Sequence, residues 1–148
     1  MLQQIRVTKI FTIEMAHVLL GYDGDCKNIH GHSYKLLVAV KGEVRNENGH
    51  VKDGMVMDFS VLKEIVKLEI IHKYDHSLVL NANSPHALID LSAFEKVFYL
   101  PYQPTSENLV MAFATLIQSK MPKRITLCKV VLSETATSFA EWNIEDNQ

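Results

Sequence analysis

The order in which the hydrophobic pattern changes period limits the folds open to this chain. Apolar side chains alternate with a period of two over 5–15 and 33–44, a pattern typical of strands. They follow helical spacing over 58–73 and 106–121, and further strand patterns cover 125–133 and 137–144. Strands that succeed one another through short turns favour antiparallel pairing, with helices on one face. The order strand, strand, helix, helix, strand, strand therefore predicts an α+β fold with a four-stranded antiparallel sheet.

No internal repeat, low-complexity tract or flexible linker interrupts this pattern, so we interpret residues 1–148 as one domain. A chain of 148 residues buries roughly two-thirds of the surface that its unfolded form exposes. It therefore needs neither a disulfide nor a metal merely to build a core. Residues 81–104 contain three prolines and little regular pattern. They predict a long connection, with a short helix near 91–96.

The charge balance argues against a nucleic-acid partner. The formal net charge is −2, from 15 basic and 17 acidic residues, whereas binding to phosphate backbones rests on clustered Lys and Arg. No apolar run approaches the ~20 residues that cross a bilayer, and residues 1–6 lack the layout of a signal peptide. With only two cysteines, a disulfide scaffold is not expected. We therefore expect a cytoplasmic protein without a membrane partner.

A His-Gly-His motif at the expected start of the second strand is the most informative local pattern. His30 and His32 are two residues apart, so both rings point to one side of a strand. His17 ends the first strand, which in a hairpin lies beside the start of the second. We expect the three rings to converge, and three histidines with an open position are typical of catalytic zinc. The alternative is surface or core histidines with local hydrogen bonds, the interpretation that we adopt for His50, His72 and His86.

The two cysteines have different settings. Cys26 precedes the histidine pair in an expected loop, and a thiolate beside zinc and Lys27 would have a depressed pKa. Spacing alone leaves three interpretations open for Cys26: a base or nucleophile, a fourth zinc ligand, or an inert small hydrophobic residue. Cys128 lies in the middle of an apolar strand, which favours inert packing.

Two acidic positions are further candidates for chemistry. Asp75 and His76 follow the first expected helix, and such a pair can orient and tune a proton-transfer group. The alternative is that Asp75 caps a turn and His76 is solvated. Glu134 interrupts an apolar run, so it is either at a solvated strand end or an acceptor in a pocket. A carboxylate accepts two parallel N–H bonds, which suits a ring amide next to an exocyclic amine.

Six short motifs follow one another along nearly the whole chain. They are Phe11-Thr12-Ile13-Glu14-Met15-Ala16-His17, Cys26-x-x-x-His30-Gly31-His32-Ser33-Tyr34, Gly54-Met55-Val56-Met57-Asp58-Phe59, Tyr74-Asp75-His76, Pro104-Thr105-Ser106-Glu107-Asn108 and Ser133-Glu134-Thr135. Their order and spacing together resemble the 6-pyruvoyl-tetrahydropterin synthase family, and within it the bacterial 6-carboxy-tetrahydropterin synthases of queuosine biosynthesis. The resemblance implies the tunnelling fold, in which sheets join around a threefold axis and two trimers stack into a hexamer. Active sites then lie between subunits.

The resemblance also implies roles for particular residues. His17, His30 and His32 match the family's zinc ligands, and Cys26 matches its catalytic cysteine. Asp75 and His76 match the partners that complete the catalytic triad. Glu134 matches the anchor of the pterin ring, and Thr105 and Ser106 match a segment that lines the pterin pocket. For the triphosphate, Lys27, Lys35 and Lys73 are candidate contacts.

The resemblance implies a zinc-dependent lyase. Its expected substrate is 7,8-dihydroneopterin triphosphate, and the expected products are 6-carboxytetrahydropterin, acetaldehyde and triphosphate. One alternative is the 6-pyruvoyl reaction, in which triphosphate is eliminated and the side-chain carbons stay. Another is a non-catalytic, zinc-stabilised module that binds a pterin or purine, and a third is a structural zinc domain. The presence of Cys26 argues against the branch that carries glutamate at this position.

Overall fold

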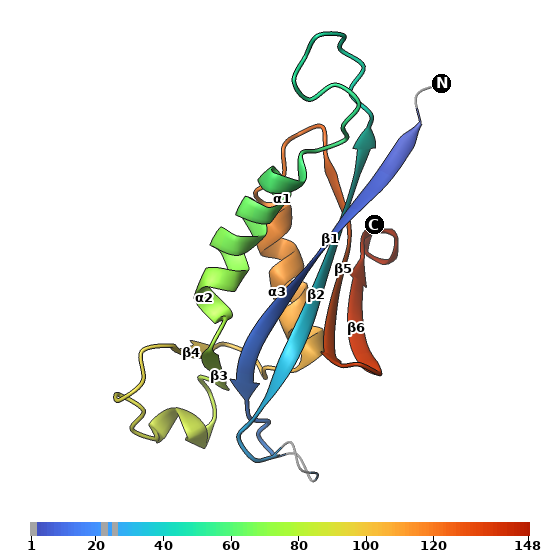
Figure 1. The fold of residues 1–148 in the computed structure, drawn as a ribbon. Helices are drawn as coiled ribbons and strands as arrows, with labels where there is room; N and C mark the ends of the chain where they lie inside the picture. Colours follow the sequence, from blue (N-terminus) through green and yellow to red (C-terminus); the bar gives the residue numbers. More distant parts are fainter. Residues whose placement is uncertain (1–2, 22–23, 25–26) are drawn as a thin grey trace.

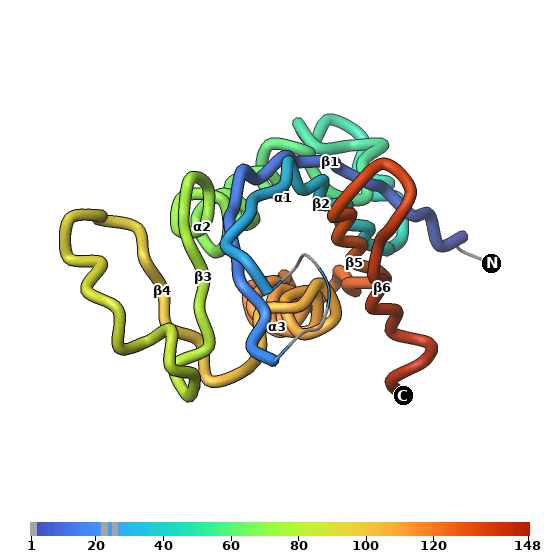
Figure 2. Tube along the Cα trace, turned by 90° about the horizontal axis from the view of Figure 1, so that it is seen from below, coloured from blue at the N-terminus to red at the C-terminus, as the bar shows by residue number. Residues whose placement is uncertain are grey.

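A long hairpin at the start of the chain organises the fold. β1 (Gln4–His17) pairs antiparallel with β2 (His30–Glu43) from Gln4 opposite Glu43 to His17 opposite His30. The structure is a computed structural model that describes residues 3–21, 24 and 27–148. Its sheet has the strand order β4-β3-β1-β2-β5-β6 (Figures 1 and 2).

The second antiparallel pair extends the sheet beyond β2. β5 (Thr126–Thr135) pairs with β2, and β6 (Ser138–Asn143) pairs with β5 at the edge. The four strands that the sequence patterns predict are therefore present and antiparallel. A final short 3-10 helix, η4 (Ile144–Asn147), follows β6.

The prediction of a purely antiparallel, four-stranded sheet is wrong at the other edge. β3 (Ser77–Asn81) pairs parallel with the end of β1, and β4 (Val97–Leu100) pairs parallel with β3. Both are mostly apolar runs of five residues or fewer. Periodicity cannot distinguish a strand from a helix in runs this short. They become strands because the end of β1 offers an unpaired edge. The helix predicted near 91–96 is also wrong, since the helical turn here is η3 (Pro85–Leu88).

The two predicted helices form, with one irregularity. α1 (Phe59–Val66) continues through a π-helical turn, η2 (Lys67–Ile71), into α2 (His72–Tyr74), and α3 is Ser106–Gln118. Asp58 caps α1 by accepting from the Ser60 amide, and Thr105 caps α3 by accepting from the Asn108 amide. Within the described part of the chain, no helix is long and apolar enough to cross a bilayer.

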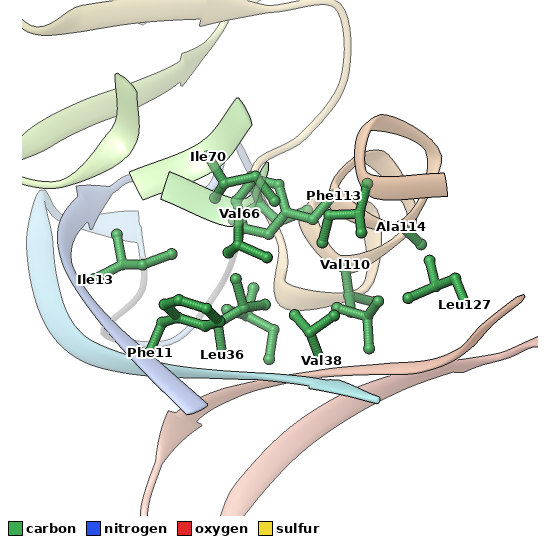
Figure 3. Close-up of a cluster of buried hydrophobic side chains, with 14 of the residues drawn as sticks. Phe11, Ile13, Leu36, Val38, Val66, Ile70, Val110, Phe113, Ala114 and Leu127 are labelled. Atoms are coloured by element: carbon green, nitrogen blue, oxygen red, sulfur yellow. The ribbon is translucent and has the colours of Figure 1, made fainter. Parts of the chain in front are cut away.

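The core lies between the helices and one face of the sheet. Figure 3 shows Phe11, Ile13 and Leu36 from the hairpin facing Val66 of α1 and Phe113 of α3. Leu68 follows the helical spacing of the predicted apolar stripe, yet it is 61% exposed. It lies in the π-helical turn η2, where the wider turn changes the face that each residue presents.

Strand alternation gives the first hairpin two chemically different faces. Along β1, Ile13, Met15 and His17 are buried, whereas Glu14 between them is exposed. This alternation carries the last residue of β1 into the interior beneath the helices. A histidine is thus placed at the end of a row of core positions.

Candidate metal and substrate site

The three predicted histidines come together where β1 ends and β2 begins. His17 lies opposite His30 in the ladder, and His32 lies opposite Met15, the preceding core position of β1. One nitrogen from each ring can be chosen so that the three atoms lie within 4.8 Å of one another. The ring centroids are 4.6 Å apart for His17–His30 and 4.9 Å for His30–His32. The hairpin therefore produces the predicted convergence.

The outer ring nitrogens of two histidines are held by backbone carbonyls. His17 Nδ1 lies 2.7 Å from the Pro104 carbonyl oxygen, and His30 Nδ1 lies 2.7 Å from that of Asn28. A carbonyl oxygen only accepts, so each Nδ1 carries the proton and donates it. In a neutral ring this leaves the lone pair on Nε2. Such an outer hydrogen bond fixes the tautomer and orientation of metal-binding histidines.

Among the residues that the structure describes, the inner nitrogens of the cluster have no hydrogen donor. His17 Nε2 and His30 Nε2 face each other at 3.0 Å, so two lone pairs oppose one another. His32 Nε2 is buried and has no hydrogen-bond partner among the described residues. Both features cost free energy in a site without a cation. They disappear if a metal ion accepts the three lone pairs, so the residues fit zinc.

Electrostatics keeps two of these rings neutral. Burial lowers the pKa of His17, and the nearby His30 and His32 lower it further. The Pro104 carbonyl and Glu134 act in the opposite direction, but the pKa remains below its ordinary value. Burial also lowers the pKa of His32, against the opposing effect of Glu134. Metal binding requires deprotonated ring nitrogens. The lowered pKa of His17 and of His32 therefore favours the neutral form that a metal needs.

Glu134 of β5 lies next to the cluster. Its Oε1 is 3.5 Å from His17 Nε2 and 3.6 Å from His32 Nε2, and its side chain is 26% exposed. Of the two alternatives for this residue, the structure favours the pocket over a solvated strand end. Its carboxylate stands between the histidines and an open cavity.

That cavity has a volume of about 460 Å³ and is lined by both predicted pocket residues, Thr105 and Ser106. Glu134, Gln103 and Phe139 also line it. Thr105 uses its oxygen to accept from the Asn108 amide, while Ser106 Oγ is buried without a hydrogen-bond partner among the described residues. The cavity wall therefore offers a carboxylate that can bond to a ligand, and the buried Ser106 hydroxyl lies in the same wall.

Asp75 and His76 form the predicted pair but lie elsewhere. His76 Nδ1 is 3.1 Å from Asp75 Oδ2, and Asp75 Oδ1 accepts from the Glu14 amide at 2.9 Å. The His76 amide donates to the Glu14 carbonyl at 2.6 Å. His76 has a left-handed backbone, with φ 63°, and its side chain is 76% exposed. Burial raises the Asp75 pKa, but the bonds from Glu14 and His76 outweigh it and leave that pKa below its ordinary value.

This pair is on the opposite face of the sheet from the three histidines. The cavity beside His76 is lined mainly by Glu14, Ala16, Gly31 and Ser33, the residues that alternate with the core positions of β1 and β2. Two core-side residues, Met15 and His32, also border it. Two faces of one sheet point in opposite directions. Among the described residues, no hydrogen bond or ion pair joins Asp75 or His76 to the three histidines.

Other predicted candidates are dispersed. Cys26 lies outside the described residues. Lys27 and Lys35 are exposed, and the Lys73 ammonium lies 5.0 Å from the centre of the Tyr74 ring. Cys128 is buried, as expected for inert packing, and burial raises its pKa.

Sequence reasoning missed three parts of the site. Tyr34 OH is 3.4 Å from His17 Nδ1. Tyr34 is two residues after His32, and this spacing alone would have predicted that both side chains lie on the same face of the strand. Gln103 pairs with both backbone groups of Leu20, through Oε1 at 3.2 Å and Nε2 at 3.0 Å. The Pro104 carbonyl that orients His17 has no side-chain signature at all.

Comparisons with known proteins identify relatives along nearly the whole chain. The family profile described as 6-pyruvoyl tetrahydropterin synthase matches residues 6–145. The 6-carboxy-5,6,7,8-tetrahydropterin synthase of Haemophilus influenzae is 33% identical over 141 residues, which cover 93% of this chain and 97% of the relative. The enzyme of the same name from Aquifex aeolicus is 35% identical over 130 residues, covering 81% and 76%.

A solved structure shows the same fold. The Plasmodium falciparum 6-pyruvoyl tetrahydropterin synthase has a TM-score of 0.71 and 23% identity, covering 94% of this chain and 96% of that one. The curled sheet with two helices is therefore a tunnelling fold, as the motifs predicted. The profile match over nearly the whole length places this chain in the 6-pyruvoyl tetrahydropterin synthase family.

Proposed function

We propose that this protein is a 6-carboxy-5,6,7,8-tetrahydropterin synthase. It converts 7,8-dihydroneopterin triphosphate to 6-carboxytetrahydropterin, acetaldehyde and triphosphate, in the cytoplasm and for queuosine biosynthesis. The names of its relatives support the reaction class, a lyase-type synthase. The observation that carries the proposal is the set of three imidazoles beside a cavity lined by Glu134, with inner nitrogens that have no hydrogen donor among the described residues.

His17, His30 and His32 are the proposed zinc ligands. When bound, zinc lowers the pKa of the substrate's side-chain hydroxyl groups. The carbonyls of Pro104 and Asn28 hold two of the rings in the required tautomer. Burial of His17 keeps that ligand neutral.

Glu134, Thr105 and Ser106 are the proposed pterin contacts. The Glu134 carboxylate matches the paired N–H donors of the 2-amino and N3 groups. Ser106 Oγ is buried at the wall of the cavity and needs a partner. The cavity of about 460 Å³ is large enough for a bicyclic ring with part of its side chain.

Cys26, Asp75 and His76 are the proposed proton-transfer residues. Asp75 accepts the Nδ1 proton of His76, which leaves Nε2 to exchange a proton with substrate. Because the pair is on the opposite face from the histidines, we propose that a second copy supplies it. This agrees with the homohexamer of two trimers expected from the resemblance.

The decisive test is a product assay with zinc-loaded protein and 7,8-dihydroneopterin triphosphate. Products are identified by mass spectrometry, and acetaldehyde is trapped separately. Carboxytetrahydropterin with acetaldehyde supports the proposal. Pyruvoyltetrahydropterin without acetaldehyde would identify the 6-pyruvoyl reaction instead, and no turnover with zinc bound would favour a binding module.

A further inference from the structure

The strand that the sequence patterns missed delivers a lysine to the proposed proton-transfer pair. Lys96 directly precedes β4, and its ammonium donates to the carbonyls of His72 at 3.0 Å and Asp75 at 2.8 Å. Its own carbonyl accepts from the Leu78 amide at 2.9 Å, one residue into β3. Lys96 thus contacts the chain on both sides of His76.

These contacts lie where the backbone most needs support. Asp75 is the C-cap of α2, so nearby carbonyls lack partners within the helix and attract a cation. His76 then adopts a left-handed conformation, which is unfavourable for a residue with a side chain. A strained residue persists only when its surroundings hold it in place. The Lys96 ammonium holds the carbonyls of His72 and Asp75 before His76, and the Glu14 carbonyl holds the His76 amide.

The charge of Lys96 reaches the carboxylate as well. Burial raises the Asp75 pKa, whereas the bonds from Glu14 and His76 and then the charges of His76 and Lys96 lower it. Asp75 therefore stays ionised and oriented toward His76 Nδ1. Lys96 itself is exposed, and it need not touch substrate to have this effect.

We propose that Lys96 is a positioning residue, which grips the carbonyls of His72 and Asp75 so that His76 is presented to substrate in one orientation. The segment between β3 and β4 then has a role, because it returns the chain to the pair that needs support. This inference rests on the proposed function, in which Asp75 and His76 transfer protons.

The test compares Lys96→Met, Lys96→Arg and Lys63→Met in the zinc-loaded, full-length protein. Methionine keeps the length and removes the donors, arginine keeps the donors, and Lys63 is an exposed lysine of α1. We expect Lys96→Met to lower kcat roughly tenfold with KM within about twofold, because misplaced groups slow chemistry more than binding. Lys96→Arg should keep kcat within about threefold of wild type, since its fork can reach two carbonyls. Lys63→Met should match wild type.

A second readout does not depend on turnover. Hydrogen exchange of the peptide that spans 72–80 should be at least about threefold faster in Lys96→Met, while a peptide within α3 stays unchanged. The inference is overturned if exchange or kcat is unchanged in Lys96→Met, or if Lys96→Arg is as impaired as Lys96→Met. If wild type itself forms no pterin product, the proposed function fails, and the exchange comparison alone decides whether Lys96 holds this segment.

Discussion

The histidine cluster and the Asp75–His76 pair lie at the same end of the sheet, but they differ in how deeply they are buried. The cluster is enclosed, with His17 fully buried and two outer nitrogens bonded to carbonyls. The pair is anchored through Glu14, yet the His76 ring is 76% exposed on the other face. The difference is the basis for our proposal that folding alone builds the metal site, whereas a second copy completes the proton-transfer site.

The largest expected effect is on the histidine cluster. His32→Ala removes a ligand that forms no hydrogen bond in the described structure, so the fold should survive while zinc binding is lost. Since zinc supplies several kcal/mol of stabilisation in such reactions, turnover should fall below detection. Zinc content by mass spectrometry and circular dichroism check this, with the exposed His50→Ala as the control. A folded, active His32→Ala without zinc would break the assignment.

The next prediction tests whether a second copy supplies His76 to the histidine cluster. His76→Ala should lower kcat by about 10²- to 10⁴-fold, the usual contribution of a proton-transfer group. If each site combines the cluster of one copy with His76 of another, mixing His76→Ala with His32→Ala subunits restores activity. After random reassembly in equal amounts, about a quarter of the sites have both parts intact. Mixtures that stay inactive after confirmed subunit exchange would place both parts in one copy.

A smaller effect separates the pterin contact from the metal cluster. Glu134→Gln keeps the size of the side chain and removes its charge. Bonds to charged groups are about twice as strong as neutral ones, so KM should rise roughly 10- to 100-fold with zinc content unchanged. Zinc loss with an unchanged KM would instead assign Glu134 to the histidine cluster as a metal ligand. The 3.5 Å distance from Glu134 Oε1 to His17 Nε2 makes this the main alternative.

The smallest effect is a difference in pH dependence between the regions. The folded state lowers the pKa of His17 and His32 from 6.5, so the unfolded chain binds more protons just below that value. The stability of metal-free protein should be full above pH 6.5 and fall as pH decreases from there. The lowered pKa of Asp75 changes the stability of the fold only below about pH 3.8, the ordinary pKa of this group.

Thermal unfolding of metal-free protein across pH measures both windows. His17→Gln should flatten the decline below pH 6.5, and Asp75→Asn should flatten only the decline below pH 3.8. A wild-type Tm that does not change between pH 7 and pH 5 would contradict the shift at the histidines.

Local patterns predicted the cluster because its geometry is local. Residues two apart on a strand share a face, and a hairpin brings the end of one strand to the start of the next. His17 opposite His30 follows from these two rules alone. The caps at Asp58 and Thr105 are local in the same sense, since capping depends on a few adjacent residues.

The parts that escaped prediction depend on distant chain. Pro104 contributes a backbone carbonyl to His17 across 87 residues, and any residue type offers the same atom. β3 and β4 are strands only because β1 provides an edge for parallel pairing. Lys96 has a role only because that pairing carries it to the end of α2.

By itself, the sequence determined the four long strands, the two helices and which histidines would meet, because periodicity and hairpin connection are short-range properties. Only the tertiary structure decided that Asp75 and His76 lie on the face opposite those histidines. The side of a sheet on which a loop residue emerges depends on how its strand pairs, and the residues of β3 pair with residues of β1 that lie 62 positions earlier, as Ser77 does with Met15. The parallel register of β3 places Ser77 beside Met15, and the His76 side chain before it is left 76% exposed.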